Sequence, residues 1–162
     1  MINTDLVPFV ELFPEQAIAE TRTITTRGHT VLPDDEYALV ESFCPDPTCD
    51  CRRVMLNVLA RHHTTRHYLA SISFGFDRDG EMAGPFLDPL NPQSRYARAL
   101  LEIVQRMLET DAAYVARLES HYQQVKVAVA DPAHPVHKTL EEIDKASERR
   151  MKRPRRRRRG RR

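Results

Sequence analysis

The sequence predicts an α+β fold, an antiparallel β-meander packed by two to three C-terminal helices. Three segments in the first half of the chain alternate apolar and polar side chains, as half-buried strands do. Three segments in the second half repeat apolar residues at the i, i+3, i+4 spacing of an amphipathic helix. All the cysteines lie between the first two strand segments, which predicts a cysteine knuckle there. Strands followed by helices are typical of the α+β class.

The strand segments cover residues 36–43, 53–60 and 68–76. Each one places its aromatic and aliphatic residues on one face, which favours an antiparallel meander with one buried side. These face residues are Tyr37, Leu39 and Phe43, then Val54, Leu56 and Val58, then Ala70, Ile72, Phe74 and Phe76. Before them, residues 15–20 are expected to form a short helix, and the β-branched alternation of residues 21–26 predicts a further strand.

Three helices are predicted after the meander. Ser94 is expected to cap a helix over 94–108, and Thr110 or Asp111 to cap a second one that ends near Val129. The short break between these two helices predicts an antiparallel pair. A third, more polar helix is expected over 136–150. The apolar stripe of the first helix comprises Ala97, Leu100, Leu101, Val104, Met107 and Leu108.

Charge divides the chain into an acidic body and a basic tail. Residues 149–162 contain eleven Lys and Arg residues and no acid, whereas the whole chain has 25 basic and 23 acidic residues. Residues 1–148 therefore hold 14 basic and 23 acidic residues, a net charge of −9. We expect 1–148 to form one metal-binding domain and 149–162 to be disordered alone, because the tail has little apolar surface to bury.

Composition favours a soluble protein of a reducing cytoplasm. Hydrophobic residues make up 41% of the chain and charged residues 30%, and no run of 18 apolar residues is present that would span a membrane. The first residues include acids and lack the basic start of a secretory signal.

Cys44, Cys49 and Cys51 fall within eight residues in a C-x4-C-x-C pattern. Zinc takes thiolate ligands at about 2.3 Å and prefers four ligands at tetrahedral corners, so three sulfurs on one tight loop can share one ion. Pro45 and Pro47 stiffen this loop. The neighbouring Arg52 and Arg53 are expected to offset the negative charge of three thiolates around a divalent ion, so the loop predicts a zinc site.

Three other interpretations of the cysteines stay open. A disulfide would leave one thiol over and conflicts with a reducing compartment. Inert buried cysteines are common, but a loop rich in proline and aspartate is a poor place for core residues. A redox or catalytic thiol is the third alternative.

His121 is the best candidate for the fourth ligand, and the alternative is that it is a histidine at the edge of the core, bonded to a carbonyl or a carboxylate. It lies three residues after Leu118 and four before Val125, at the edge of an apolar helical face that is expected to pack on the sheet. His29, Glu41 or a water molecule are the substitutes. A strand rises about 3.3 Å per residue, which places the turn containing His62, His63 and His67 about 25 Å from the cysteines, at the other end of the hairpin. These three histidines, like the acidic pair Asp34 and Asp35, are expected to be solvated, and a separate weak metal site at the histidines is the alternative.

The tail is the candidate nucleic-acid-binding segment. Lys and Arg residues that contact phosphates release counterions, and arginine adds bidentate geometry. The tail has no aromatic residue for stacking on bases, so binding to nucleic acid or the ribosome should be blind to sequence. A tail without function, a tail folded onto the acidic body, and weak binding to an anionic membrane are the alternatives. The arginines expected to bind are Arg153, Arg155, Arg156, Arg157, Arg158 and Arg159.

Signatures of common enzymes are absent from the sequence. It has no H-E-x-x-H motif, no glycine-rich phosphate loop, no G-x-S-x-G motif and no zinc-deaminase pattern. We therefore expect a zinc-binding protein without catalysis whose tail contacts nucleic acid. An adaptor domain with a purely structural metal is the alternative, and a metal-dependent enzyme with an open ligand position is the second alternative.

The runs YALVESFCPDPTCDCRRVMLNV and FLDPLNPQSRYARALLEIVQRML resemble a family of small uncharacterised bacterial proteins that share the C-x4-C-x-C loop. Some members carry a C-terminal SEC-C metal motif, which is absent here because no cysteine follows Cys51. The resemblance implies metal binding and gives no activity.

Overall fold

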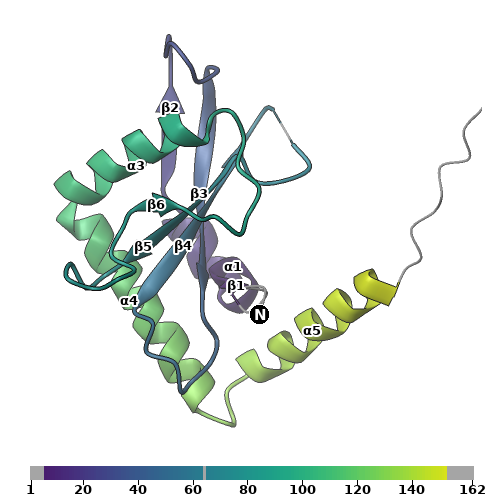
Figure 1. The fold of residues 1–162 in the computed structure, drawn as a ribbon. Coiled ribbons are helices and arrows are strands. Elements are labelled where there is room, and N and C mark those ends of the chain that lie inside the picture. Colours follow the sequence, from purple (N-terminus) through teal and green to yellow (C-terminus); the bar gives the residue numbers. More distant parts are fainter. Residues whose placement is uncertain (1–5, 64, 153–162) are drawn as a thin grey trace, which may run out of the picture.

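A computed structural model describes residues 6–63 and 65–152 (Figure 1). It confirms the α+β class: an antiparallel sheet comes first and three helices follow it. The strands are β1 (Val7–Pro8), β2 (Thr23–Thr26), β3 (Asp35–Phe43), β4 (Arg53–Ala60), β5 (Ala70–Gly75) and β6 (Phe86–Leu87). The helices are α1 (Phe9–Leu12), α2 (Pro14–Glu20), α3 (Ala97–Thr110), α4 (Ala112–Ala130) and α5 (Val136–Lys152).

The sheet has the order β1-β3-β4-β5-β6, and β2 also pairs with β3. Its centre is the predicted meander, with Leu39 opposite Val58 and Leu56 opposite Ile72. These apolar residues lie on one face and are fully buried, because the register aligns the alternating pattern of each strand with that of its neighbours. The short strands β1 and β6, two residues each, carry too little periodic sequence to be predicted.

The opposite face of the sheet carries a buried polar cluster. Asn57 on β4 donates to Ser42 on β3 at 3.3 Å and accepts from Ser71 on β5 at 2.7 Å. All three side chains are buried, so these cross-strand bonds satisfy polar groups that burial would otherwise penalise. The two faces therefore have different roles, and the helices cover the apolar one.

Helices α3 and α4 lie on different parts of the sheet. Helix α3 contacts β5 and β6, whereas α4 contacts β3 and β4. The two helices form a V rather than the predicted antiparallel pair (Figure 1). Asp111 caps α4, because its carboxylate accepts from the Tyr114 backbone N–H at 3.0 Å. Ser94 does not cap α3; its hydroxyl donates to the Leu69 carbonyl at 2.7 Å, and the helix begins at Ala97.

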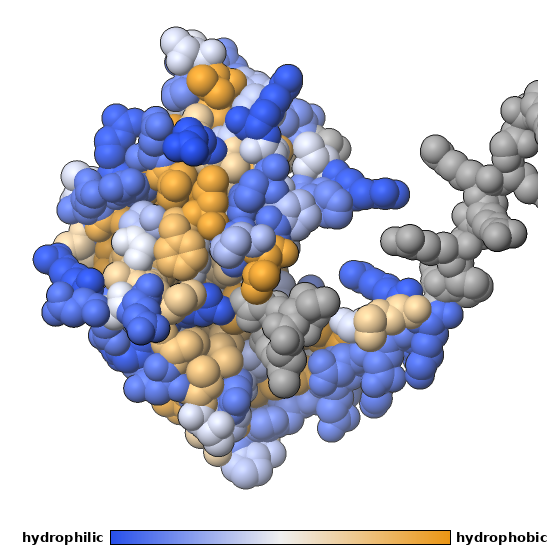
Figure 2. Space-filling view, in the orientation of Figure 1, coloured by the Kyte–Doolittle hydropathy of each residue, from blue (hydrophilic) through white to orange (hydrophobic). Residues whose placement is uncertain are grey.

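Helix α5 extends away from the body and presents a mostly hydrophilic surface (Figures 1 and 2). Only Val136 on it is buried. The helix continues to Lys152, four residues past the predicted end of the domain at 148. Arg149 to Lys152 are good helix formers, and Lys152 pairs with Glu148 one turn earlier at 3.6 Å, so the helix does not end where the basic run begins.

Candidate metal centre

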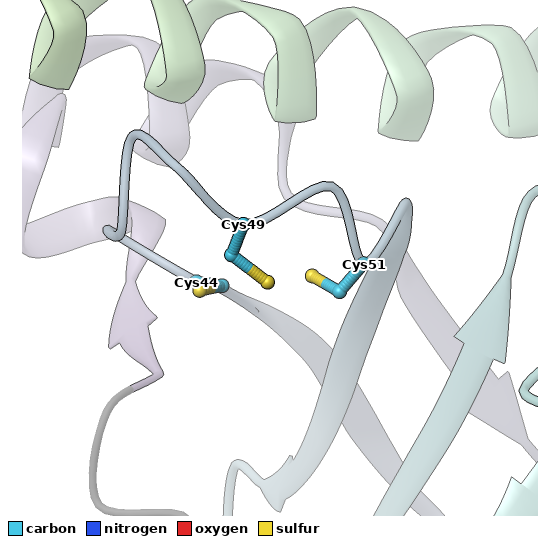
Figure 3. A group of neighbouring side chains, drawn as sticks. All are labelled: Cys44, Cys49 and Cys51. Carbon is cyan, nitrogen blue, oxygen red and sulfur yellow. The ribbon is translucent and has the colours of Figure 1, made fainter.

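The loop between β3 and β4 brings all three cysteines together (Figure 3). One sulfur each from Cys44, Cys49 and Cys51 lies within 4.8 Å of the other two. Each residue is partly buried, and the three thiols are free. The predicted convergence of the sulfurs is therefore present in the fold, and this group could hold a metal ion.

A turn centred on Asp46 folds the first half of the loop. The Asp46 carboxylate accepts from the backbone N–H and the hydroxyl of Thr48, both at 2.8 Å. These bonds from Thr48 lower the pKa of Asp46. The Cys49 N–H then donates to the Asp46 carbonyl at 3.3 Å. This side-chain turn reverses the chain and returns Cys49 toward Cys44.

Arg52 ends the loop in an uncommon backbone conformation. Its φ of 44° lies in the left-handed region, which a residue with a Cβ adopts only when its surroundings hold it there. Its side chain pairs with Asp77 at 3.0 Å and with Glu119 on α4 at 2.8 Å, and its carbonyl accepts from the Phe76 N–H at 2.9 Å. The Arg52 guanidinium is thus paired with two carboxylates. The Arg53 guanidinium donates to Ser73 Oγ at 3.4 Å.

Proximity of the three thiols opposes their ionisation. Burial raises the pKa of Cys51, and repulsion from Cys49 and Cys44 raises it further. Lys126 on α4 acts in the opposite direction. A thiolate is the form that binds metal, so a cation at this position would remove the repulsion and release protons. Three thiolates this close together repel one another, and a bound metal cation would relieve that repulsion.

His121 lies on the predicted helix, but the structure does not bring it to the cysteines. Its Nδ1 is 2.6 Å from Glu41 Oε2, and its Nε2 is 2.5 Å from Glu20 Oε2. The ring also stacks on Phe9 with 4.3 Å between centroids. Both nitrogens are therefore occupied, in place of the predicted metal ligation. Neighbouring residues on a helix point about 100° apart, and here it is Tyr122 that faces the loop.

The predicted substitutes for His121 are also engaged elsewhere. Glu41 is the partner of His121, and His29 Nδ1 accepts from the backbone N–H groups of Val31 and Leu32, each at 3.0 Å. Within residues 6–63 and 65–152, no fourth His, Cys, Asp or Glu joins the three sulfurs.

His62 and His63 lie outside the cysteine group as predicted, yet they are not a simple solvated turn. The Asp35 carboxylate, whose side chain is 1% exposed, accepts from His62 Nδ1 at 2.9 Å and from His63 Nδ1 at 2.7 Å. His67 is exposed, as expected. The prediction that Asp35 is a solvated charge is wrong, because the backbone N–H groups of His62 and His63 also donate to it.

Three residues of α4 that the sequence analysis did not identify bind the cysteine loop. Tyr122 Oη accepts from the Arg52 N–H at 3.2 Å and lies 3.4 Å from Asp50. Lys126 Nζ donates to the Asp46 carbonyl at 2.7 Å, and Glu119 pairs with Arg52. Their spacing of three and four residues places them on one helical face, a signal visible only once the loop is known to lie under that face.

The predicted nucleic-acid residues Arg153 and Arg155 to Arg159 lie outside the described residues. Of the basic run, Arg149, Arg150 and Lys152 are seen, in the last turn of α5.

Comparison with protein-family models, with curated proteins and with solved structures finds no match to this chain. The resemblance to small bacterial proteins therefore stays a prediction. Among the described residues, no helix is both long and apolar enough to cross a membrane.

Proposed function

We propose that this protein binds one zinc ion through Cys44, Cys49 and Cys51, and that the ion stabilises the connection between the two central strands. The approach of the three sulfurs to within 4.8 Å of one another carries the proposal. Soft thiolates select zinc or copper(I) over hard cations, and zinc adds no redox chemistry of its own. A reducing cytoplasm is the compartment that keeps such thiols available.

A structural role fits the position of the loop. Its two ends continue directly into β3 and β4, which pair with each other along the centre of the sheet. An ion that ties the loop closed therefore also fixes the ends of these strands, and its binding free energy contributes to folding. An adaptor protein with a stapled fold is compatible with this role. An enzyme would need a displaceable ligand in the fourth position.

Zinc analysis of the full-length chain, purified under reducing conditions without chelator, tests the proposal. We expect about one zinc per chain. Alkylation of the native protein should label the three cysteines slowly when zinc is present and quickly after chelation, because bound thiolates are poor nucleophiles. Metal-free protein whose cysteines react equally fast with and without added zinc would refute the proposal.

Contact with nucleic acid or the ribosome through the basic tail is a second candidate function. The observation that favours it is the direction of α5, which carries the start of the basic run away from the acidic body (Figure 1). Exposed cations at the end of a projecting helix can reach a phosphate backbone without competing carboxylates of the body. Binding by this route is electrostatic, so it should fall steeply with salt.

A further inference from the structure

One face of α4 is shaped to hold the cysteine loop. Glu119, Tyr122 and Lys126 lie on this face, and the helix passes over the loop that carries the cysteines (Figure 3). Lys126 contacts Asp46, which lies between Cys44 and Cys49. The face therefore reaches the first limb of the loop through a direct hydrogen bond.

Tyr122 reaches the second limb. Its hydroxyl lies against Asp50, between Cys49 and Cys51, and accepts from the N–H of Arg52, the residue that follows Cys51. Since Arg52 has its left-handed φ of 44°, this N–H has a fixed direction that sets how the chain leaves Cys51. Tyr122 itself is buried against Phe43 and Phe76, with ring centroids 6.4 and 5.7 Å away, so its hydroxyl is held in place by packing.

Lys126 brings a positive charge to the loop. A divalent ion with three thiolates has a net charge of −1, which is costly at a partly buried position unless a cation lies near it. Arg52 already pairs with Asp77 and Glu119. Lys126, in contrast, donates to a neutral carbonyl and takes part in none of the ion pairs seen among residues 6–63 and 65–152.

We infer that Tyr122 and Lys126 are positioning residues of the metal site: Tyr122 fixes the geometry of the loop, and Lys126 offsets the charge of the three-thiolate complex. This inference rests on the proposed function. Groups that orient metal ligands without touching the ion typically contribute 10- to 100-fold to metal affinity.

Tyr122→Phe tests the hydroxyl, because it keeps the ring and its packing. We expect the full-length variant to bind zinc about 10-fold more weakly than wild type in competition with a chromogenic chelator. Tyr114→Phe is the matched control: Tyr114 lies on the same helix, and among the described residues its buried hydroxyl has no hydrogen-bond partner. Its zinc affinity should equal that of wild type.

Lys126→Met tests the charge and should bind zinc more weakly than wild type. Lys126→Arg keeps the positive charge and should bind zinc more tightly than Lys126→Met. A second measurement separates an effect on the metal site from an effect on the fold. The free energy of unfolding of each variant in excess chelator reports the stability of the metal-free protein, and we expect it to change less than the zinc affinity does. Equal zinc affinity in wild type, Tyr122→Phe and Lys126→Met would overturn the inference, as would an equal loss in Tyr114→Phe. Failure of wild type to bind zinc would instead overturn the proposed function, so the two failures are distinct.

Discussion

His121 and Glu41 form a buried pair in the protein interior, with Nδ1 of the imidazole 2.6 Å from Oε2 of the carboxylate and both side chains less than 5% exposed. Glu20 closes the other side of the ring. Ionised carboxylates only accept hydrogen bonds, so an imidazole between two of them must carry both N–H groups and a positive charge. This cluster joins α2, β3 and α4, three elements that are distant in the sequence.

Stability should therefore fall as the pH rises above neutrality. Burial alone would lower the pKa of His121, but the bonds from Glu41 and Glu20 outweigh it, and the pKa lies above its ordinary value of 6.5. The folded state thus holds this proton more tightly than the unfolded state. The contribution is complete below about pH 6.5 and is lost as the pH rises through the folded-state pKa.

His121→Gln provides the comparison, since it cannot titrate. We expect it to lower the free energy of unfolding by about 3 kcal/mol at pH 6, because it leaves a buried carboxylate without its cation. Denaturation curves at pH 6 and pH 9, in chelator and reductant, should show a loss of stability in wild type that the variant lacks. Parallel pH dependence in the two proteins would rule out the charged cluster.

Cys49→Ser should reduce bound zinc from about one per chain to a small fraction, because two thiolates hold zinc poorly. At free zinc 100-fold above the dissociation constant, wild type should gain about 2.7 kcal/mol of stability that the variant does not. Thr48→Ser is the neighbouring control, since serine keeps the hydroxyl that bonds to Asp46 at 2.8 Å. Thermal unfolding with and without zinc measures the difference. A zinc-dependent shift of equal size in Cys49→Ser would exclude Cys49 as a ligand.

Asp35→Asn should destabilise the protein most near neutral pH. Burial opposes ionisation of this carboxyl, but hydrogen bonds from the Glu36 N–H, His62 and His63 outweigh it, so its pKa lies well below the ordinary value of 3.8. Its contribution to stability is therefore present above about pH 3.8 and is lost as the pH falls through the folded-state pKa. An asparagine NH₂ would also face the N–H donors.

Asp34→Asn is the control for that variant, because Asp34 is the neighbouring carboxylate and accepts from the Gly28 N–H at an exposed turn. Acid denaturation monitored by circular dichroism should give a shallower pH dependence for Asp35→Asn than for wild type or Asp34→Asn. If all three lose stability alike between pH 5 and pH 2, Asp35 is not the group responsible.

Removing Arg149 to Arg162 should abolish binding to polyanions and leave zinc content unchanged, since the cysteine loop lies between β3 and β4, far from the segment removed. Binding of the full-length and shortened proteins to two unrelated oligonucleotides at two salt concentrations measures this. The full-length chain should bind both equally and lose affinity steeply with salt. Salt-dependent binding by the shortened protein would place the site in the body.

Local pattern was sufficient for much of the fold. The strands β3, β4 and β5 were predictable because each alternates over six or more residues, and the cysteine cluster because all its members lie on one short loop. The contacts of His121 and Asp35 depend on which elements meet in space. No periodicity indicates that Glu20 and Glu41, 21 residues apart in sequence, enclose one imidazole from a distant helix.

The zinc-edge X-ray absorption of the full-length, zinc-loaded protein tests the central claim most directly, because it counts the sulfur atoms bound to the metal. We predict three sulfur neighbours at about 2.3 Å, with one lighter atom completing the tetrahedron. Cys44→Ser, Cys49→Ser and Cys51→Ser should each remove one sulfur from whatever zinc remains bound. A zinc ion surrounded only by nitrogen and oxygen atoms, or a sulfur count that none of these substitutions changes, would contradict the three-cysteine site.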